Sequence, residues 1–365
     1  METFTAGFIG LGLIGGSIAR AIKKYYPSSH IIATSRSIRT TAYALQEGII
    51  DEALDTIDDT FRTCDYIFLC APVECNAAYL STLKPLLKEG CILTDVGSTK
   101  SDIHAKVAEL GLEKYFIGGH PMAGSEKTGI ENSKALLLEN AYYVLTPTSV
   151  TSPEMLERYR KLVETIRALP LILTCEKHDY VTAAISHLPH IIASALVNLV
   201  KDSDYEDETM KKVAAGGFKD ITRIASSSPE MWEQICSTNS ENIMRVLDDY
   251  INSLISIRFS MAERDTKRIY ELFATSRDYR NSLPDTGRGP IPPSYGIYCD
   301  MRDEAGGIAA LASILASNSI SIKNIGIVHN REFEEAVLNV EFYEEEVKEK
   351  AAELLRNYHY TIYER

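Results

Sequence analysis

A glycine-rich turn near the N-terminus constrains the fold of this chain more than any other feature. Gly10, Gly12 and Gly15 form a GxGxxG pattern between a short apolar segment, residues 5–9, and a run of helical character, residues 18–25. In such a turn the first glycine makes the bend, the second lets the backbone approach a pyrophosphate, and the third lets helix and strand pack closely. The context therefore predicts the opening strand–turn–helix unit of a dinucleotide-binding sheet.

Strands and helices are predicted to alternate as far as residue 174. The apolar segments that predict strands are residues 30–34, 66–71, 91–96, 115–117, 142–145 and 171–174, and those that predict helices include residues 74–87 and 153–168. The unbroken apolar character of residues 66–71 is typical of a parallel strand covered on both faces. The pattern predicts an α/β Rossmann domain, doubly wound, over residues 1–174.

The residues after the second strand bear on the choice of cofactor. An enzyme that uses NAD commonly places an acid about 20 residues beyond the glycine turn, where it bonds the ribose hydroxyls. This chain has Ser35 and Arg36 there. Arg36 could meet a 2′-phosphate, or could stack on adenine or face solvent. These residues favour NADP without excluding NAD. The predicted cofactor contacts are Gly10, Gly12, Leu13, Ile14, Gly15, Ser35, Arg36, Ala71 and Pro72.

A second glycine-rich segment, residues 118–129, carries one histidine, His120. Histidine titrates near neutral pH, so a loop at the end of a strand that holds it suits acid–base chemistry. The alternative is a glycine-rich turn whose histidine only bonds backbone. Upstream, Ser98 and Thr99 follow another predicted strand. Either could cap the helix that follows, and capping does not exclude a contact with substrate.

Residues 175–283 contain no predicted strand and indicate an all-α domain. One long helix is expected over residues 176–201. It holds His187 and His190, which lie on neighbouring faces. They are candidates for core positions or for binding, and a metal site is disfavoured because no third ligand is near. Further helices are expected at residues 231–249 and 251–273, and long apolar helices of this kind often bury against a second subunit.

Between these helices lies a segment with three charged residues, Lys219, Asp220 and Arg223. Arg223 could hold a carboxylate through two hydrogen bonds, or could pair with Asp220 one helical turn earlier.

The C-terminal part predicts a separate small domain. Residues 284–293 are rich in proline and glycine and indicate a linker. Strands are predicted at residues 295–301, 320–328, 336–343 and 358–363, with helices at residues 308–316 and 345–357. The order βαββαβ is that of the ferredoxin-like fold, expected over residues 294–365.

Composition narrows the classes of partner. The net charge of −13 makes nucleic acid an unfavourable ligand. Seven cysteines without a CxxC pair indicate reduced thiols in the cytoplasm and no metal site. No run suggests a signal peptide or a membrane-spanning segment.

Taken together, the motifs resemble those of prephenate dehydrogenases of the TyrA family. The resemblance rests on GxGxxG at residues 10–15, HPMAGSEKTG at 120–129, and SHLPH at 186–190 with the segment at 216–223. It covers about residues 4–275, and the C-terminal unit is similar to an ACT domain. The resemblance implies a homodimer that oxidises prephenate with loss of CO2, passes hydride to NAD or NADP, and is inhibited by tyrosine.

The resemblance also implies roles for single residues. His120 accepts the proton of the ring hydroxyl, Ser98 orients His120, and His190 contacts the pyruvyl side chain. Arg223 binds a substrate carboxylate. The remaining implied residues are Glu126 and Lys219, as charges around the substrate, and Asp303, Ala305, Gly306 and Gly307, as the regulatory loop.

Two alternatives stay open. One is a related enzyme, an arogenate dehydrogenase or another hydroxy-acid dehydrogenase, although SHLPH argues against the latter. The other is a non-catalytic sensor of a dinucleotide and an amino acid, against which the intact His120 and Arg223 argue.

Overall fold

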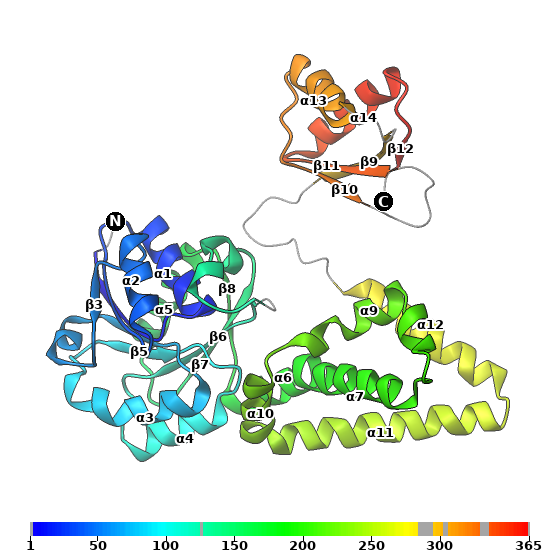
Figure 1. Ribbon diagram of the computed structural model, residues 1–365. Helices are drawn as coiled ribbons and strands as arrows, with labels where there is room; N and C mark the ends of the chain where they lie inside the picture. The colour runs from blue at the N-terminus through cyan, green and yellow to red at the C-terminus, as the bar shows by residue number, and fades with distance from the viewer. Residues whose placement is uncertain (1–2, 125–126, 284–294, 302–305, 329–335, 364–365) are drawn as a thin grey trace. The chain divides into compact units, whose positions relative to one another are not determined.

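The computed structural model describes residues 3–124, 127–283, 295–301, 306–328 and 336–363 (Figure 1). The chain forms two compact units, Met1–Arg280 and Asn281–Arg365.

The first unit begins with a five-stranded parallel sheet in the order β3-β2-β1-β4-β5. Its elements are β1 (Thr5–Ile9), α1 (Leu13–Tyr25), β2 (His30–Thr34), α2 (Ile38–Gln46), β3 (Glu52–Leu54), β4 (Tyr66–Leu69), α3 (Val73–Leu83), β5 (Ile92–Asp95) and α4 (Ser101–Glu109). Helix α1 begins at Leu13, before the predicted start at residue 18. Gly15 therefore lies within the first turn of the helix.

A second sheet of three strands, in the order β6-β7-β8, continues the first. Its elements are β6 (Ile117–Pro121), β7 (Tyr142–Pro147), α5 (Pro153–Thr165) and β8 (Leu169–Ile172). A parallel bridge between Leu93 and Phe116 connects the two sheets, whereas β6 and β7 run antiparallel. Strand β8 begins two residues before the predicted segment.

Apolar cores on both faces of the parallel sheet explain the Rossmann architecture. One core contains Ile18 of α1 and Tyr159 of α5. The other contains Leu80 of α3 and Val107 of α4. Helices therefore cover both faces, as the alternating pattern predicts for a doubly wound domain.

The prediction that His120 lies on a loop is wrong. His120 is the fourth residue of β6 and pairs with Val144 of β7. Glycine has a low preference for strands, but Gly119 permits a close approach here, since a Cβ on it would lie 2.7 Å from the carbonyl oxygen of Asp95. Tight packing against the end of β5 thus outweighs the local propensity.

The helical part follows, and its first helix is not continuous. Instead of one helix over residues 176–201, the structure has α6 (Cys175–Thr182), a π-helical turn (Ala183–His187) and α7 (Leu188–Ser203). Pro189 stands in the first turn of α7 and cannot donate a backbone hydrogen bond, so a change in the helical repeat before it is physically reasonable.

The whole stretch Cys175–Ser203 is long and apolar enough to cross a membrane by length and composition, contrary to the expectation from sequence. His178 and Asp179 in its first turns are fully buried. Their hydrogen bonds to the Rossmann domain place the start of the stretch in the interior of the first unit.

The remaining helices differ from the predicted bounds. They are α8 (Thr209–Val213), α9 (Gly216–Thr222), α10 (Pro229–Thr238), α11 (Ser240–Ala262) and α12 (Thr266–Ser282), with a 3-10 turn at Arg223–Ser226. The breaks fall at Asn239, whose side chain is engaged in tertiary hydrogen bonds, and at Arg264, which has a φ of 52°. Neither position is a Gly or Pro, the residues that usually indicate the end of a helix.

Helices α11 and α12 expose many large apolar side chains. They are Met244, Ile251, Leu254, Ile255, Phe259, Met261, Tyr270, Phe273 and Tyr279. An exposed apolar surface of this extent is typical of a contact with another protein surface.

The second unit has the predicted order βαββαβ. Its elements are β9 (Tyr295–Met301), α13 (Gly307–Ser317), β10 (Asn324–Val328), β11 (Ala336–Phe342), α14 (Glu345–Asn357) and β12 (Ile362–Tyr363). They form one antiparallel sheet in the order β10-β11-β9-β12. Strands β10 and β12 are shorter than predicted, and Ser319 and His359, with φ of 57° and 68°, form the turns that follow α13 and α14.

Candidate active site

The glycine turn forms an open binding surface at the start of α1. Gly10 has a φ of +91°, and a Cβ on it would lie 2.9 Å from the backbone of Cys70 and Ala71, so only glycine fits. Gly12, the N-cap of α1, has no side chain that could cap the helix, and a Cβ on it would meet nothing within 4 Å. The first N–H groups of α1 are thus available to an anion.

The other predicted cofactor residues gather at the same edge of the sheet. Ser35 and Arg36 follow β2, with Arg36 exposed, and Ala71 and Pro72 follow β4. Because β2, β1 and β4 are neighbours, their C-terminal ends meet where such sheets bind dinucleotides. The residues present therefore fit a dinucleotide cofactor.

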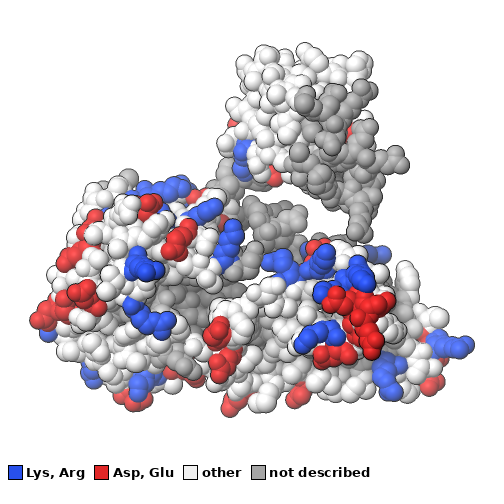
Figure 2. Space-filling view, viewed as in Figure 1, with Lys and Arg blue, Asp and Glu red and all other residues white. Residues whose placement is uncertain are grey.

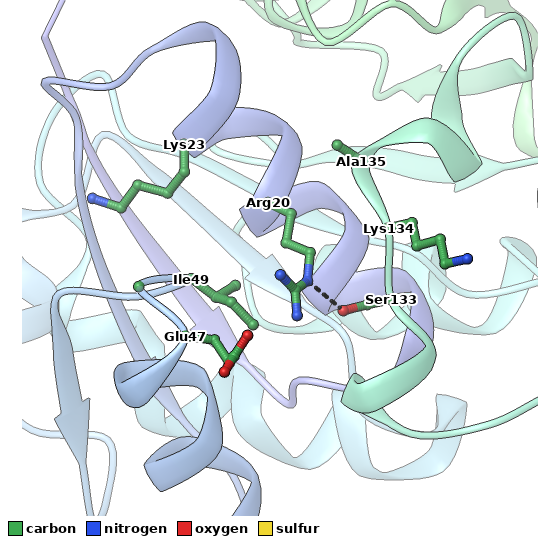
Figure 3. A pocket seen from close by; sticks show the side chains of 8 residues that line it. Arg20, Lys23, Glu47, Ile49, Ser133, Lys134 and Ala135 are labelled. Atoms are coloured by element: carbon green, nitrogen blue, oxygen red, sulfur yellow. Dashed lines mark hydrogen bonds between the residues drawn. The ribbon is translucent and has the colours of Figure 1, made fainter.

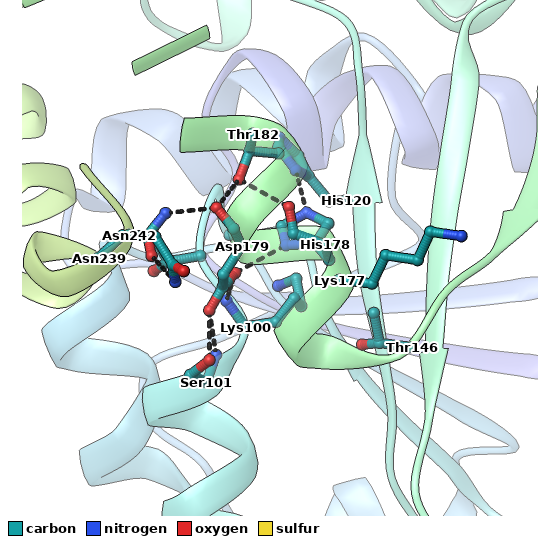
Figure 4. Close-up of polar contacts among 12 residues, drawn as sticks. Lys100, Ser101, His120, Thr146, Lys177, His178, Asp179, Thr182, Asn239 and Asn242 are labelled. Atoms are coloured by element: carbon teal, nitrogen blue, oxygen red, sulfur yellow. Dashed lines mark hydrogen bonds and ion pairs between the residues drawn. The ribbon is translucent and has the colours of Figure 1, made fainter. Parts of the chain in front are cut away.

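His120 is held by a buried histidine that the sequence analysis did not single out (Figure 4). The Nδ1 atom of His120 lies 2.8 Å from Nε2 of His178, and Nδ1 of His178 lies 2.8 Å from Oδ1 of Asp179. His178 and Asp179 are fully buried, whereas His120 keeps partial exposure. One nitrogen of His120 is thus occupied by protein, and Nε2 remains for a ligand.

The carboxylate of Asp179 also joins the helical part to the Rossmann domain. It accepts hydrogen bonds from the backbone N–H groups of Lys100 and Ser101 and from the Ser101 hydroxyl. It thereby caps the first turn of α4 from another domain. The alternative that Ser98 or Thr99 caps α4 is not observed, and the Thr99 hydroxyl lies 3.0 Å from that of Thr238 instead.

A buried ion pair lies beside His120. The Nζ atom of Lys100 donates to Oδ2 of Asp95, and neither side chain is more than 2% exposed. Asp95 also accepts from the backbone of Gly97 and of Gly119, the residue before His120. The pair therefore connects the end of β5 to β6 next to His120.

Burial and nearby basic side chains lower the pKa of His120 well below its ordinary value. Burial is the largest cause, followed by electrostatic repulsion between a protonated His120 and the basic groups His178, Lys100 and His187. A histidine with a depressed pKa is neutral at physiological pH and can accept a proton.

The second histidine pair has two different environments. His187 is buried, its Nδ1 accepts from the Asn239 amide, and burial lowers its pKa to about 4. Nδ1 of His190 donates to the carbonyl of Ser186, which leaves Nε2 available. The His190 ring stacks on Trp232 at 3.9 Å between ring centroids.

The remaining predicted site residues lie in the helical part, in the turn after β5 and in the second unit, and some are not among the described residues. Arg223 is exposed at the start of the 3-10 turn that follows α9, and its charge contributes to lowering the pKa of His190 after the larger effect of burial. Lys219 is exposed on α9, and Ser98 is half-buried in the turn after β5. Glu126, Asp303 and Ala305 are not among the described residues. Gly306, with a φ of 98°, precedes α13, and Gly307 begins it.

A separate pocket of about 390 Å³ lies on the Rossmann domain (Figure 3). It is lined by Arg20 and Lys23 of α1 and by the segment from Ser133 to Ala135, and Nε of Arg20 donates to Ser133. It contains none of the residues around His120.

On the described part of the face in Figure 2, acidic and basic side chains are interspersed.

These features define the class of protein: a dinucleotide-dependent dehydrogenase with a candidate catalytic histidine, His120, where a Rossmann domain meets a helical domain. Two family models match the chain, the nucleotide-binding domain of prephenate dehydrogenase over residues 18–170 and its dimerization domain over residues 174–275. The chain belongs to the prephenate dehydrogenase family, and it is an NAD(P)-dependent oxidoreductase with that activity.

Individual relatives agree over most of the chain. A prephenate dehydrogenase of Bacillus subtilis (strain 168) is 38% identical over 348 residues, which is 95% of this chain and 94% of the relative. Among solved structures, prephenate dehydrogenase from A. aeolicus, in complex with hydroxyphenyl propionate and NAD+, is 30% identical with a TM-score of 0.74, over 78% of this chain and 99% of that one. Synechocystis arogenate dehydrogenase is 31% identical with a TM-score of 0.68, over 77% and 100%.

Proposed function

We propose that His120 is the general base for the oxidation of prephenate by this enzyme, a reaction that releases CO2 and gives 4-hydroxyphenylpyruvate. The observation that carries the proposal is the hydrogen bond of His120 Nδ1 to His178, which leaves Nε2 free at a depressed pKa. Nε2 takes the proton of the hydroxyl on ring carbon C4 of prephenate. A bound nicotinamide supplies the acceptor for the hydride from the same carbon.

Loss of CO2 needs little further help from the protein. Once C4 becomes a carbonyl, the C1 carboxylate belongs to a vinylogous β-keto acid, and its departure makes the ring aromatic. The protein's part is to orient the substrate so that C4 faces His120.

Substrate orientation falls to residues of the helical part and of the turn after β5. Arg223 binds one substrate carboxylate, and His190 contacts the pyruvyl side chain through Nε2, the nitrogen not bonded to Ser186. Ser98 bonds near the C4 hydroxyl, and Glu126 and Lys219 adjust the charge around the substrate.

The proposed cofactor is NAD or NADP, and the residues after β2 lean toward NADP. Ser35 stands where an acid would repel a 2′-phosphate, and the exposed guanidinium of Arg36 follows it.

The enzyme is proposed to act as a homodimer in the cytoplasm. The region that matches the family's dimerization domain includes α11, and the apolar side chains of α11 and α12 suit burial against a second copy. All seven cysteines are free, which fits a reducing compartment.

The C-terminal unit is proposed to be an ACT domain that binds tyrosine. Its support is the βαββαβ order and the turn at Gly306, where a left-handed backbone leads into α13. Tyrosine is the end product of the pathway, and its binding there would favour a less active state.

One assay tests the reaction and its alternatives. Purified enzyme is mixed with prephenate or arogenate, each with NAD or NADP, and the absorbance of the reduced nicotinamide is followed. We expect turnover with prephenate. Turnover with arogenate alone would replace prephenate as the substrate, and no turnover in any mixture would favour the non-catalytic sensor.

A further inference from the structure

Two buried residues in the first turns of α6 form a hydrogen-bonded chain that ends on His120. His178 Nε2 lies 2.8 Å from His120 Nδ1, and Asp179 Oδ1 lies 2.8 Å from His178 Nδ1. The two imidazole rings meet edge to face, with centroids 5.0 Å apart. Neither His178 nor Asp179 is exposed, so neither can meet the substrate directly.

The protonation of Asp179, at the buried end of these hydrogen bonds, decides which nitrogen donates and which accepts. Burial raises the pKa of Asp179, but hydrogen bonds from His178 and Ser101 lower it more, and the net shift is downward. An ionised carboxylate only accepts hydrogen bonds. His178 must therefore carry its proton on Nδ1, and a neutral His178 has an acceptor at Nε2. That acceptor requires the proton of neutral His120 to be on Nδ1.

The other hydrogen bonds of Asp179 hold its carboxylate in a fixed orientation. Oδ1 also accepts from the Lys100 N–H, and Oδ2 accepts from the N–H and the hydroxyl of Ser101. The carboxylate cannot turn away without leaving the first turn of α4 uncapped. The other charged or titratable groups that bear on His120 are Lys100 and His187, and neither hydrogen-bonds its Nδ1.

We propose that His178 and Asp179 are positioning residues that hold His120 in the Nδ1–H tautomer, with Nε2 deprotonated and facing the substrate. This inference rests on the proposed role of His120 as the base. Without the hydrogen bonds from His178 and Asp179, neutral His120 could carry its proton on Nε2, and that nitrogen would have no lone pair to accept the hydroxyl proton. Catalysis in this enzyme thus depends on a residue that the helical part supplies to a histidine of the Rossmann domain.

Two amide substitutions at position 178 separate positioning from a purely structural role. The amide group of Gln can reach the place of His Nε2, so His178→Gln keeps an acceptor for His120 Nδ1–H but loses the bond to Asp179. The shorter Asn reaches the place of Nδ1, so His178→Asn keeps a donor for Asp179 but leaves His120 unheld. The two side chains are alike in polarity.

The proposal predicts that His178→Gln keeps kcat within about threefold, whereas His178→Asn loses about ten- to hundredfold, the worth of a hydrogen bond to a group that becomes charged. KM for prephenate should change little in both. Thermal unfolding of both variants checks that they are folded. A structural role predicts the opposite order, because only Asn retains the contact with Asp179. Equal losses, or a larger loss for Gln, would overturn the proposal.

A second measurement does not depend on the substrate. The ¹⁵N shifts of the imidazole nitrogens, measured on histidine-labelled enzyme at neutral pH, should show His120 protonated at Nδ1 in the wild type and in His178→Gln. Protonation at Nε2 in the wild type would overturn the inference. If the tautomer is as expected while His120→Asn keeps a near-normal kcat, the proposed role of His120 as base fails and the positioning stands.

Discussion

Replacing Lys100 by methionine should destabilise the first unit strongly, because it removes one half of a fully buried ion pair. Lys100 Nζ donates to Asp95 Oδ2, and the two side chains are 0% and 2% exposed. Methionine fills most of the same volume, so the change in packing is small. The carboxylate of Asp95 keeps its hydrogen bonds from Gly97 and Gly119 but loses its counter-charge.

The magnitude follows from the cost of an unpaired buried charge. Removing one partner of a buried pair costs about 3–5 kcal/mol. In a domain of this size each kcal/mol shifts the unfolding midpoint by about 2–4 °C, so a decrease of roughly 6–20 °C is expected. The measurement is thermal unfolding followed by far-UV circular dichroism.

A matched control lies within α4, the helix that begins directly after Lys100. Lys106 pairs with Glu109 at 2.7 Å, but these side chains are 34% and 64% exposed. Lys106→Met should therefore cost less than about 1 kcal/mol. If Lys100→Met destabilises no more than Lys106→Met, the reasoning about the buried pair is refuted.

The same substitution has a kinetic consequence at His120. The charge of Lys100 contributes to lowering the pKa of His120, after the larger effects of burial and of His178. Its removal raises that pKa. Since the base must be deprotonated, activity falls as pH drops through its pKa, and the acid limb of the kcat/KM profile should move to higher pH in Lys100→Met. An unchanged acid limb in folded enzyme would show that this limb does not report His120.

Three further predictions concern binding and control. Arg223→Ala should raise KM for prephenate by about ten- to hundredfold with a smaller effect on kcat, since a carboxylate is bound in ground and transition states alike; lower stability at constant KM would favour an ion pair with Asp220 instead. Ser35→Asp should shift the ratio of kcat/KM toward NAD, because the carboxylate bonds the ribose and repels a 2′-phosphate; an unchanged ratio would place the ribose elsewhere. Truncation after Leu283 should keep activity and lose most inhibition by tyrosine, measured at low and saturating prephenate, whereas equal inhibition of both forms would assign the inhibition to the active site.

The parts of the fold that depend on local pattern could be predicted from the sequence. The strand–turn–helix around Gly10, Gly12 and Gly15 and the βαββαβ order of the second unit both follow from spacing within short windows. The ends of helices were less predictable where a side chain forms a hydrogen bond with a residue far away in the sequence. Asn239 ends α10 while its amide donates to the backbone of Asp179, 60 residues earlier.

The candidate site could be predicted only in part, for the same reason. His120 is conspicuous because glycines surround it, but the residues that hold it are 58 positions away on α6. His178 and Asp179 have one local signal, an adjacent pair of polar residues that can be ionised, ahead of an apolar helical stretch. That signal says nothing about which domain they contact, since the contact arises only when α6 packs on β6 and α4.

The most direct test of the account is the kcat of His120→Asn with prephenate at neutral pH. Asparagine can still bond to His178 but cannot accept the hydroxyl proton at the position of Nε2. We expect kcat to fall by about a hundredfold or more while KM changes much less, because a positioned general base is worth that factor. A folded His120→Asn enzyme with near-normal kcat would contradict the assignment of His120 as the base.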